Sequence, residues 1–207
     1  MGPDSRIFGL HGPPPGTASA CLTHTLLPVL NSLQQVQEWQ ALARTQGHPL
    51  AAALQLDSGM CRFGLTEAEV NHLATHPQGL EGIEVTLVLS HLGCADTPDH
   101  PLNRQQLETF TRLKALLPAA PASLAASSGI FLGPDWHFDL VRPGAALYGI
   151  APTAGQPNPM HATVRLQARV IQTRMVPAGA SVGYGGAFTA RQPTPVAPVS
   201  YTHLRAH

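Results

Sequence analysis

The chain has 207 residues, of which 43% are hydrophobic and 12% charged, so its composition allows a buried core and does not suggest disorder. Its 12 basic and 12 acidic residues give a formal net charge of zero, which argues against nucleic acid and against an anionic membrane as main partners. No stretch approaches the apolar length of a membrane-spanning helix, so we expect no membrane association.

The cysteines indicate a reducing environment. Cys21, Cys61 and Cys94 are far apart, odd in number and form no C-x-x-C pair. A disulfide framework or a zinc site is therefore not expected. Free thiols fit the cytoplasm, and the start of the chain lacks the basic and apolar regions of a signal peptide.

Apolar segments alternate with amphipathic segments over residues 1–150. Strands are expected at Arg6–His11, Leu50–Leu56, Gly82–Leu89, Ser123–Ala126 and Phe138–Val141, with a further apolar patch at Leu26–Leu30. Helices are expected from the cap residue Ser32 to about Gln46, from Thr66 to about His76, and from Leu102 to Leu117. A spacing of roughly 30–40 residues between strands is typical of parallel βα units, of which we expect about five.

The pattern changes after residue 150. Residues 151–160 are rich in proline and glycine and are typical of a linker, and residues 161–198 indicate the start of a β domain. Within that domain, Ala162–Ile171 alternates like a half-buried strand, and Val182–Phe188 is glycine-rich and extended. Residues 199–207 carry no hydrophobic period and resemble the translated read-through of a sequencing adapter, with a short native tail as the alternative.

Polar residues follow four of the expected strands. They are Arg62, His91, Ser127 with Ser128, and Arg142 with Gly144. In an α/β barrel such positions line the active site. Singly, each has a plainer interpretation: a surface ion pair for Arg62, a core histidine for His91, a helix cap for Ser127, and a surface charge for Arg142. At equivalent positions in successive βα units, chance is a poorer explanation.

The segments around these residues resemble a known family. Leu56–Gly64, Ser90–Asp96, Ala125–Gly129, Val141–Gly149 and Val182–Gly186 look like successive blocks of bacterial alanine racemase, in the family's order. The resemblance covers nearly the whole chain from about Arg6 to Val196. It implies a pyridoxal 5'-phosphate-dependent isomerase that interconverts L-alanine and D-alanine for cell-wall peptidoglycan synthesis. It also implies an N-terminal TIM-type (β/α) barrel, a C-terminal β domain and a head-to-tail homodimer.

The resemblance also implies roles for individual residues. Tyr184 matches the tyrosine that serves as one of the two acid/base groups, reaching the other subunit's barrel. His91 matches the histidine that contacts this tyrosine, and Arg62 matches the arginine near the substrate carboxylate. Arg142 matches the arginine that bonds the pyridine nitrogen, and Ser127 matches a phosphate ligand, helped by the Gly144 backbone amide.

The sequence departs from the family pattern at both ends. Nothing matches the Schiff-base lysine on the family's first barrel strand, and Lys114, the only lysine of the chain, lies in a leucine-rich helical pattern where it should be a solvated surface residue. The first expected strand looks like a middle strand of the barrel, and most of the β domain is missing. We therefore expect a fragment, truncated at both ends, that is inactive alone. Ala126 stands where many members have Asn, and Gln55 where some have a carbamylated lysine.

Two further interpretations remain open. One is a broad-specificity amino-acid racemase of the same fold, because the sequence does not fix the substrate beyond a small amino acid. The other is a non-catalytic carrier of pyridoxal phosphate with a single barrel, against which the β segment after the linker argues.

Overall fold

The computed structural model describes residues 5–163 and 168–200. The chain divides into two compact units, Met1–Thr163 and Val164–His207, each held together by contacts of its own.

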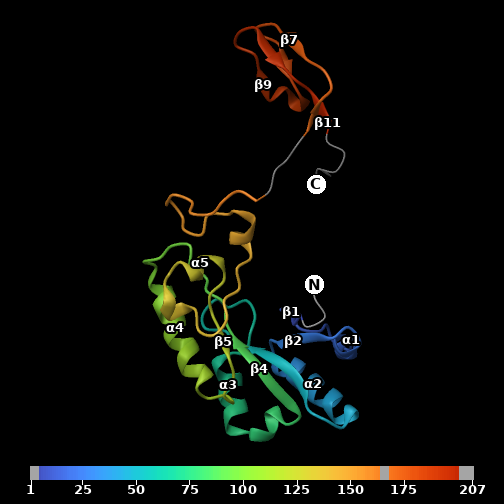
Figure 1. Ribbon diagram of the computed structural model, residues 1–207, viewed down its shortest axis with the longest axis vertical. Helices are drawn as coiled ribbons and strands as arrows, with labels where there is room; N and C mark the ends of the chain where they lie inside the picture. The colour runs from blue at the N-terminus through green and yellow to red at the C-terminus, as the bar shows by residue number, and fades with distance from the viewer. Residues whose placement is uncertain (1–4, 164–167, 201–207) are drawn as a thin grey trace. The chain divides into compact units, whose positions relative to one another are not determined.

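Five parallel strands form the sheet of the first unit, in the order in which they occur along the chain (Figure 1). They are β1 (Ile7–Gly9), β2 (Leu26–Leu30), β3 (Leu50–Gln55), β4 (Ile83–Leu89) and β5 (Ala122–Ser123). Neighbours that follow chain order are typical of a (β/α) barrel, whereas strand order reverses in a doubly wound sheet. The structure thus confirms the predicted partial barrel of about five βα units.

Helices connect the strands. They are α1 (Ala18–Thr23), α2 (Leu33–Gln46), α3 (Glu67–Thr75), α4 (Pro101–Lys114) and α5 (Ser127–Ile130), with the 3₁₀ turns η1 (Pro77–Leu80), η2 (Pro134–Trp136) and η3 (Ala145–Tyr148). The predicted caps are confirmed: the Ser32 hydroxyl accepts the Gln35 amide, and Thr66 and Glu69 form a capping box. In the described part of the chain, no helix is long and apolar enough to cross a membrane.

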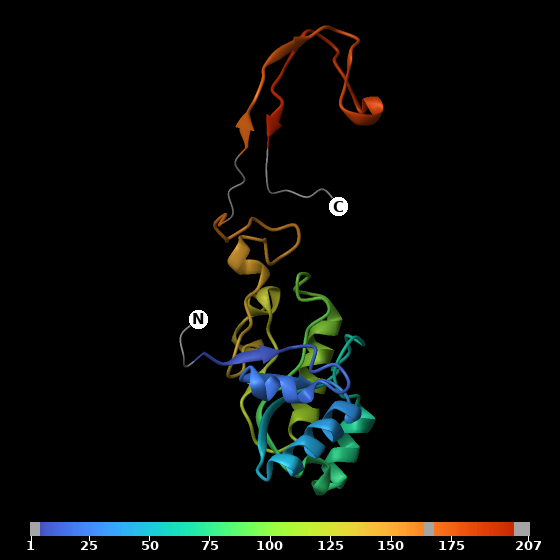
Figure 2. The ribbon, with the colours of Figure 1, turned by 90° about the vertical axis from the view of Figure 1, so that its right-hand side faces the viewer.

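The two faces of the sheet differ in what they bury. On one face, large side chains of α2 and α4 such as Trp39 and Phe110 pack in a cluster with Leu54. Figure 2 shows α2, α3 and α4 gathered to one side of the strands. The other face carries a small cluster of Val29, Ala53, Leu87 and Leu89 with Phe8 against it. Side chains alternate between the two faces along a strand, so the residues of this second cluster lie on the face that forms the interior of a barrel.

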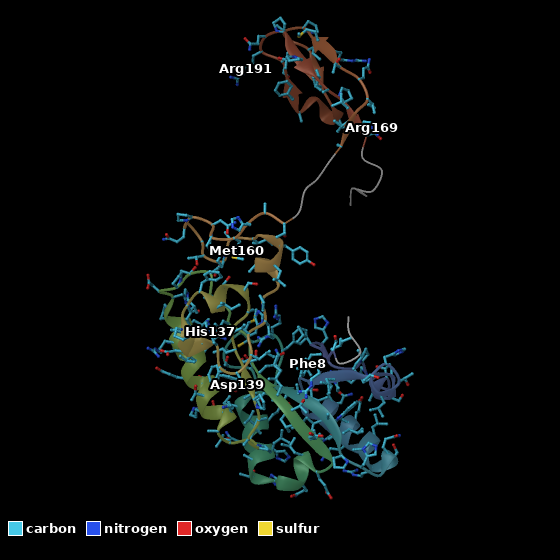
Figure 3. The ribbon with its side chains drawn as sticks, viewed as in Figure 1. Phe8, His137, Asp139, Met160, Arg169 and Arg191 are labelled. Atoms are coloured by element: carbon cyan, nitrogen blue, oxygen red, sulfur yellow. The ribbon has the colours of Figure 1, made fainter. Side chains whose placement is uncertain are left out.

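The prediction of a strand at Phe138–Val141 is wrong. Phe138 has a left-handed backbone (φ 52°) and packs edge-on against Phe110, with ring centroids 5.1 Å apart. The Asp139 carboxylate accepts the Ala122 N–H at 2.7 Å, so a side chain takes a ladder position. Asp139 is labelled in Figure 3. Regular pairing is reduced to one parallel bridge between Ala126 and Arg142. The segment still follows β5, but as irregular chain.

Helix α4 is shorter than expected. It ends at Lys114 rather than Leu117, and a tighter turn follows, in which the Leu117 N–H donates to the Lys114 carbonyl. Leu117 is buried, whereas Leu116 is 42% exposed. The change of helical pitch after Lys114 rotates Leu116 away from the core.

The second unit consists of short antiparallel pairs. They join β6 (Arg169–Val170) with β11 (Val199–Ser200), β7 (Arg174–Val176) with β10 (Thr194–Val196), and β8 (Ser181–Val182) with β9 (Phe188–Thr189), with η4 (Tyr184–Gly186) between the last two.

The ends of the second unit differ from what its sequence predicts. The half-buried strand predicted at Ala162–Ile171 is limited to Arg169–Val170, with Val170 52% exposed, and residues 164–167 lie outside the described residues. The first two residues of the expected foreign tail, Val199 and Ser200, form strand β11, and residues 201–207 lie outside the described part of the chain.

Candidate active site

Side chains that follow β3, β4 and β5 meet at the carboxyl edge of the sheet. A cavity of about 540 Å³ opens there, and Leu10, His91, Ser127, Arg142 and Gly144 contribute to its lining. A smaller cavity of about 150 Å³ is lined by Arg62 and shares Leu10, His91 and Arg142 with the larger one. Pockets of roughly 300–1,000 Å³ are of the size that binds small molecules. The structure thus brings together five of the six predicted site residues.

Arg142 is fixed by the ends of β4 and β5. Its backbone N–H donates to the Ala125 carbonyl at 2.9 Å. Its guanidinium donates to the Ser123 hydroxyl, to the Ser90 carbonyl at 2.6 Å and to the Leu124 carbonyl at 3.3 Å. Burial lowers the pKa of Arg142 to about 10, so the group remains a cation at neutral pH.

His91 lies beside two cations. Burial of the imidazole, together with the charges of Arg142 and Arg62, holds the pKa of His91 below its ordinary value. The ring is therefore neutral at neutral pH. The Arg62 guanidinium is more exposed and lies over the ring of Phe63, 5.7 Å from its centroid.

Ser127 organises the turn that carries Gly144. Its buried hydroxyl oxygen accepts the Gly144 N–H at 2.9 Å and the Ala146 N–H at 3.1 Å. The Gly144 amide, predicted to help bind a phosphate directly, is thus engaged by Ser127. Because both bonds to the hydroxyl are accepted ones, its own proton is free to be donated to a ligand.

Positive charge dominates the pocket. Neutral hydroxyl and carbonyl oxygens surround the Arg142 guanidinium, and in residues 5–163 and 168–200 the ion pair found joins Arg112 to Glu67 instead. Asp96 is the acidic residue on the lining of the larger cavity, and it is exposed. Arg142 is half-buried, and removing a cation from water without giving it a carboxylate partner costs free energy. The pocket therefore suits a ligand that brings negative charge or an unprotonated acceptor atom.

Two further residues, Tyr184 and Lys114, do not line these cavities. Tyr184 belongs to the second unit, at the start of η4, with its side chain fully exposed. Lys114 ends helix α4 and is half-buried, with its Nζ 5.9 Å from the centroid of the Phe138 ring. It was expected in mid-helix and solvated. It does not line either cavity.

Sequence reasoning missed four polar residues behind the pocket. Ser58, Ser90, Gln106 and Ser123 are all buried and hydrogen-bonded to one another or to the pocket residues. Gln106 left a signal in the sequence, because it is a polar residue in the stripe of α4 that also holds Leu107, Phe110 and Leu113. The serines left none, because a serine after a strand more often caps a turn.

Metal binding has no support in the described residues. Within residues 5–163 and 168–200, no group of three or more histidine, cysteine, aspartate and glutamate side chains could hold a metal ion.

Family comparisons cover both units. Residues 1–152 match the family model of the alanine racemase N-terminal domain, and residues 163–202 match that of the alanine racemase C-terminal domain. A catabolic alanine racemase of Mesorhizobium japonicum is 52% identical over 200 residues, and one of Agrobacterium fabrum is 50% identical over 196 residues. These alignments cover 97% and 95% of the chain but only 52% and 50% of the relatives, so the chain spans about half of their length.

Solved structures agree with this grouping. The alanine racemase of Bartonella henselae with covalently bound pyridoxal phosphate has a TM-score of 0.87 and 38% identity over 97% of this chain and 56% of that one. The biosynthetic alanine racemase of Pseudomonas aeruginosa has a TM-score of 0.82 and 33% identity over 95% of this chain and 55% of that one.

Proposed function

The chain belongs to the alanine racemase family, and on that premise we propose that it forms part of a longer protein that interconverts L-alanine and D-alanine with pyridoxal 5'-phosphate as cofactor. The observation that carries the proposal is the half-buried Arg142 cation, which has neutral partners and lines a cavity of about 540 Å³. The Bartonella relative holds pyridoxal phosphate covalently.

The pocket residues fit this cofactor. Arg142 would bond the pyridine nitrogen, because a guanidinium donates hydrogen bonds and keeps its proton. The free proton of the Ser127 hydroxyl would bind the phosphate, on the turn that Ser127 fixes through Gly144 and Ala146. When bound, the cofactor supplies an electron sink for the charge left on the α-carbon after its proton is removed.

Inversion at the α-carbon needs a base on each face of the substrate. We assign one of these roles to Tyr184, acting in the pocket of a second subunit, so the proposed racemase is a homodimer. A tyrosine has an unperturbed pKa of about 10, so it needs nearby positive charge or hydrogen bonds donated to its phenolate to act as a base near neutrality. Neutral His91 carries one N–H that could donate to the phenolate oxygen, and Arg62 and Arg142 supply positive charge next to His91. Arg62 would also receive the substrate carboxylate.

The 207-residue chain is proposed to be inactive alone. A covalent link to the cofactor needs a lysine amine, and the only lysine is Lys114. Its Nζ lies over Phe138 at the end of α4, and it lines neither of the two cavities. The lysine, and with it the second base, would come from the part of the family sequence that this chain does not contain.

The physiological role has two candidates. The predicted role is D-alanine supply for peptidoglycan in the cytoplasm, which agrees with three free cysteines. The second is alanine catabolism, which the names of the Mesorhizobium and Agrobacterium relatives favour. Deleting the gene separates them: a requirement for D-alanine supports the cell-wall role, and failure to grow on alanine as carbon source supports the catabolic one.

The test of the proposal is a racemisation assay of the purified longer protein beside the 207-residue chain. We expect the longer protein to convert L-alanine to D-alanine. The chain alone should show no conversion and should retain no cofactor absorbance after dialysis. Serine and larger amino acids in the same assay test the broad-specificity alternative, which comparable rates on all of them would support. A carrier without activity is the other alternative, against which the match to the C-terminal racemase domain argues. No conversion of any amino acid by the longer protein would reject the proposal.

A further inference from the structure

We infer that Gln106, on helix α4, is a positioning residue that holds His91 in place for the proposed racemisation, and the inference rests on that proposed function. Gln106 lies outside the lining of both cavities, so it acts through the loop that follows β4. No other side chain is hydrogen-bonded to both ends of this short loop in the described residues.

The carboxamide of Gln106 grips the loop on both sides. Its Oε1 accepts the Gly93 N–H at 2.8 Å, and its Nε2 donates to the His91 carbonyl at 2.9 Å. The second proton of Nε2 is donated to the Ser58 hydroxyl at 3.3 Å. Both donors and the acceptor of the amide are therefore used, which leaves a single orientation.

A directed chain of hydrogen bonds runs from Gln106 through Ser58 to the hydroxyl of Ser90, the residue whose carbonyl binds Arg142. Ser90 donates to the Leu56 carbonyl at 2.7 Å, so the 2.7 Å bond between the two serines runs from Ser58 to Ser90. The carbonyl of Ser90 accepts from Arg142 at 2.6 Å. Ser90 therefore accepts two hydrogen bonds. Its hydroxyl accepts from Ser58, which is itself bound to Gln106, and its backbone carbonyl accepts from Arg142. His91 and Arg142, which line the same two cavities, are thus both connected to this network.

The location of Gln106 distinguishes this network from polar groups at the protein surface. The residue is fully buried, on the helix stripe that packs against the sheet beside Leu107 and Phe110. A buried amide costs free energy unless every bond is made, and an apolar side chain would fill the same volume without that risk. What the amide adds is a fixed backbone at His91 and Gly93. A fixed backbone sets where the imidazole lies relative to Arg142 and Arg62, and small displacements of a catalytic group reduce rates strongly.

The first test replaces Gln106 with methionine in the longer racemase, since methionine keeps the length of the side chain and removes all three bonds. The control is Asn103→Leu. Asn103 is also buried on α4, but its amide donates to the Thr97 and Pro98 carbonyls, beyond the His91 loop. Both variants remove a buried amide, so both should lower the melting temperature. Only Gln106→Met should release His91.

Two readouts separate positioning from stability. NMR titration of the histidine rings, with His91 assigned by the His91→Gln variant, should show the pKa of His91 rising toward its ordinary value in Gln106→Met, because the ring becomes more solvated and moves from the two arginines. In the same variant kcat should fall by about tenfold or more while KM changes little, and Asn103→Leu should keep kcat within about twofold. An unchanged His91 titration in Gln106→Met, or the same changes in Asn103→Leu, overturns the inference.

A second variant covers the case in which Gln106→Met does not fold. In Gln106→Glu, the protonated carboxyl can still accept from Gly93 and donate to His91. When it ionises, the carboxylate repels the His91 carbonyl. We expect kcat to approach the wild-type value at low pH and to fall below it as the pH rises, whereas a pH profile parallel to that of the wild type contradicts the inference. If the wild-type protein has no racemase activity, the proposed function is rejected. The His91 titration needs no turnover, so it would still show whether Gln106 positions His91.

Discussion

At the scale of single residues, the pocket is defined by how its charges are held. Arg142 is a half-buried cation bound to oxygens that carry no formal charge, and His91 beside it is kept neutral. Serine hydroxyls and backbone carbonyls hold the arginine in place without neutralising it. The pocket therefore offers its charge to a ligand instead of using it in an internal ion pair.

The titration of His91 makes stability depend on pH. Its folded pKa is below the unfolded value of about 6.5, so between the two the unfolded chain binds more protons. The free energy of unfolding should then fall as the pH drops below about 6.5, and the loss ends at the folded pKa. Urea unfolding of wild type and His91→Gln between pH 5 and 8 should show a shallower pH dependence in the variant, and equal slopes would contradict the assignment.

Ser127 can be tested against its neighbour. Ser127→Ala leaves the Gly144 and Ala146 amides without an acceptor, which should lower the free energy of unfolding by about 1–3 kcal/mol and weaken cofactor binding. Ser128 also lines the cavity, so Ser128→Ala is the matched control and should change stability less. The measurement is chemical unfolding together with equilibrium dialysis of the cofactor. An equal loss in both variants would show that the turn does not depend on Ser127.

At the scale of elements, the loop between β3 and α3 depends on one glycine. Gly64 has φ 110°, and a Cβ there would lie 2.6 Å from the Leu56 backbone carbon. The loop closes on the strand through Leu65, whose N–H donates to the Gln55 carbonyl at 2.7 Å. Gly64→Ala should therefore lower the free energy of unfolding by roughly 1–3 kcal/mol and displace Arg62.

Gly9→Ala provides the control for Gly64. Gly9 lies in β1 without a positive φ, and a Cβ added there would meet nothing within 4 Å, so alanine should be tolerated. Thermal unfolding of both variants measures the difference. If Gly9→Ala is as destabilising as Gly64→Ala, backbone strain at Gly64 is not the cause.

Elements with local signals were predictable from sequence. The capping box of Thr66 and Glu69 and the apolar run of β4 are contained in a few consecutive residues. The prediction of a strand at Phe138–Val141 was wrong because the conformation of this segment depends on residues distant in the sequence. Phe138 packs on Phe110 of α4, and the Asp139 carboxylate binds the Ala122 N–H. The position of Arg142 in the site survived that error, because one bridge to Ala126 suffices to place it.

The buried support of the site was not predictable in the same way. Ser58 is bonded to Ser90, 32 residues away in the sequence, and to Gln106, 48 residues away. No local sequence pattern therefore reveals the network. The strand-end rule found residues whose position alone implies exposure to the pocket. The rule could not identify buried residues, such as Gln106, that support the pocket without lining it.

At the scale of the whole molecule, the two units carry different parts of the proposed chemistry. The first unit holds the pocket with Arg142 and His91, and the second holds Tyr184 on an exposed turn. The chain spans about half the length of its curated relatives, and its only lysine lies away from the pocket. The proposed racemase is therefore divided into groups supplied by this chain and a lysine supplied by the remainder of the family sequence.

The most direct test of this division is exchange of the α-hydrogen of alanine with heavy water, measured by NMR for each enantiomer in the longer protein and in its Tyr184→Phe variant. The wild type should exchange the α-hydrogen of both enantiomers and racemise them. The variant should lose racemisation, with exchange abolished for one enantiomer more than for the other, because only one of the two bases is removed. Undiminished racemisation in Tyr184→Phe, or a wild type that exchanges neither enantiomer, would contradict the proposed roles.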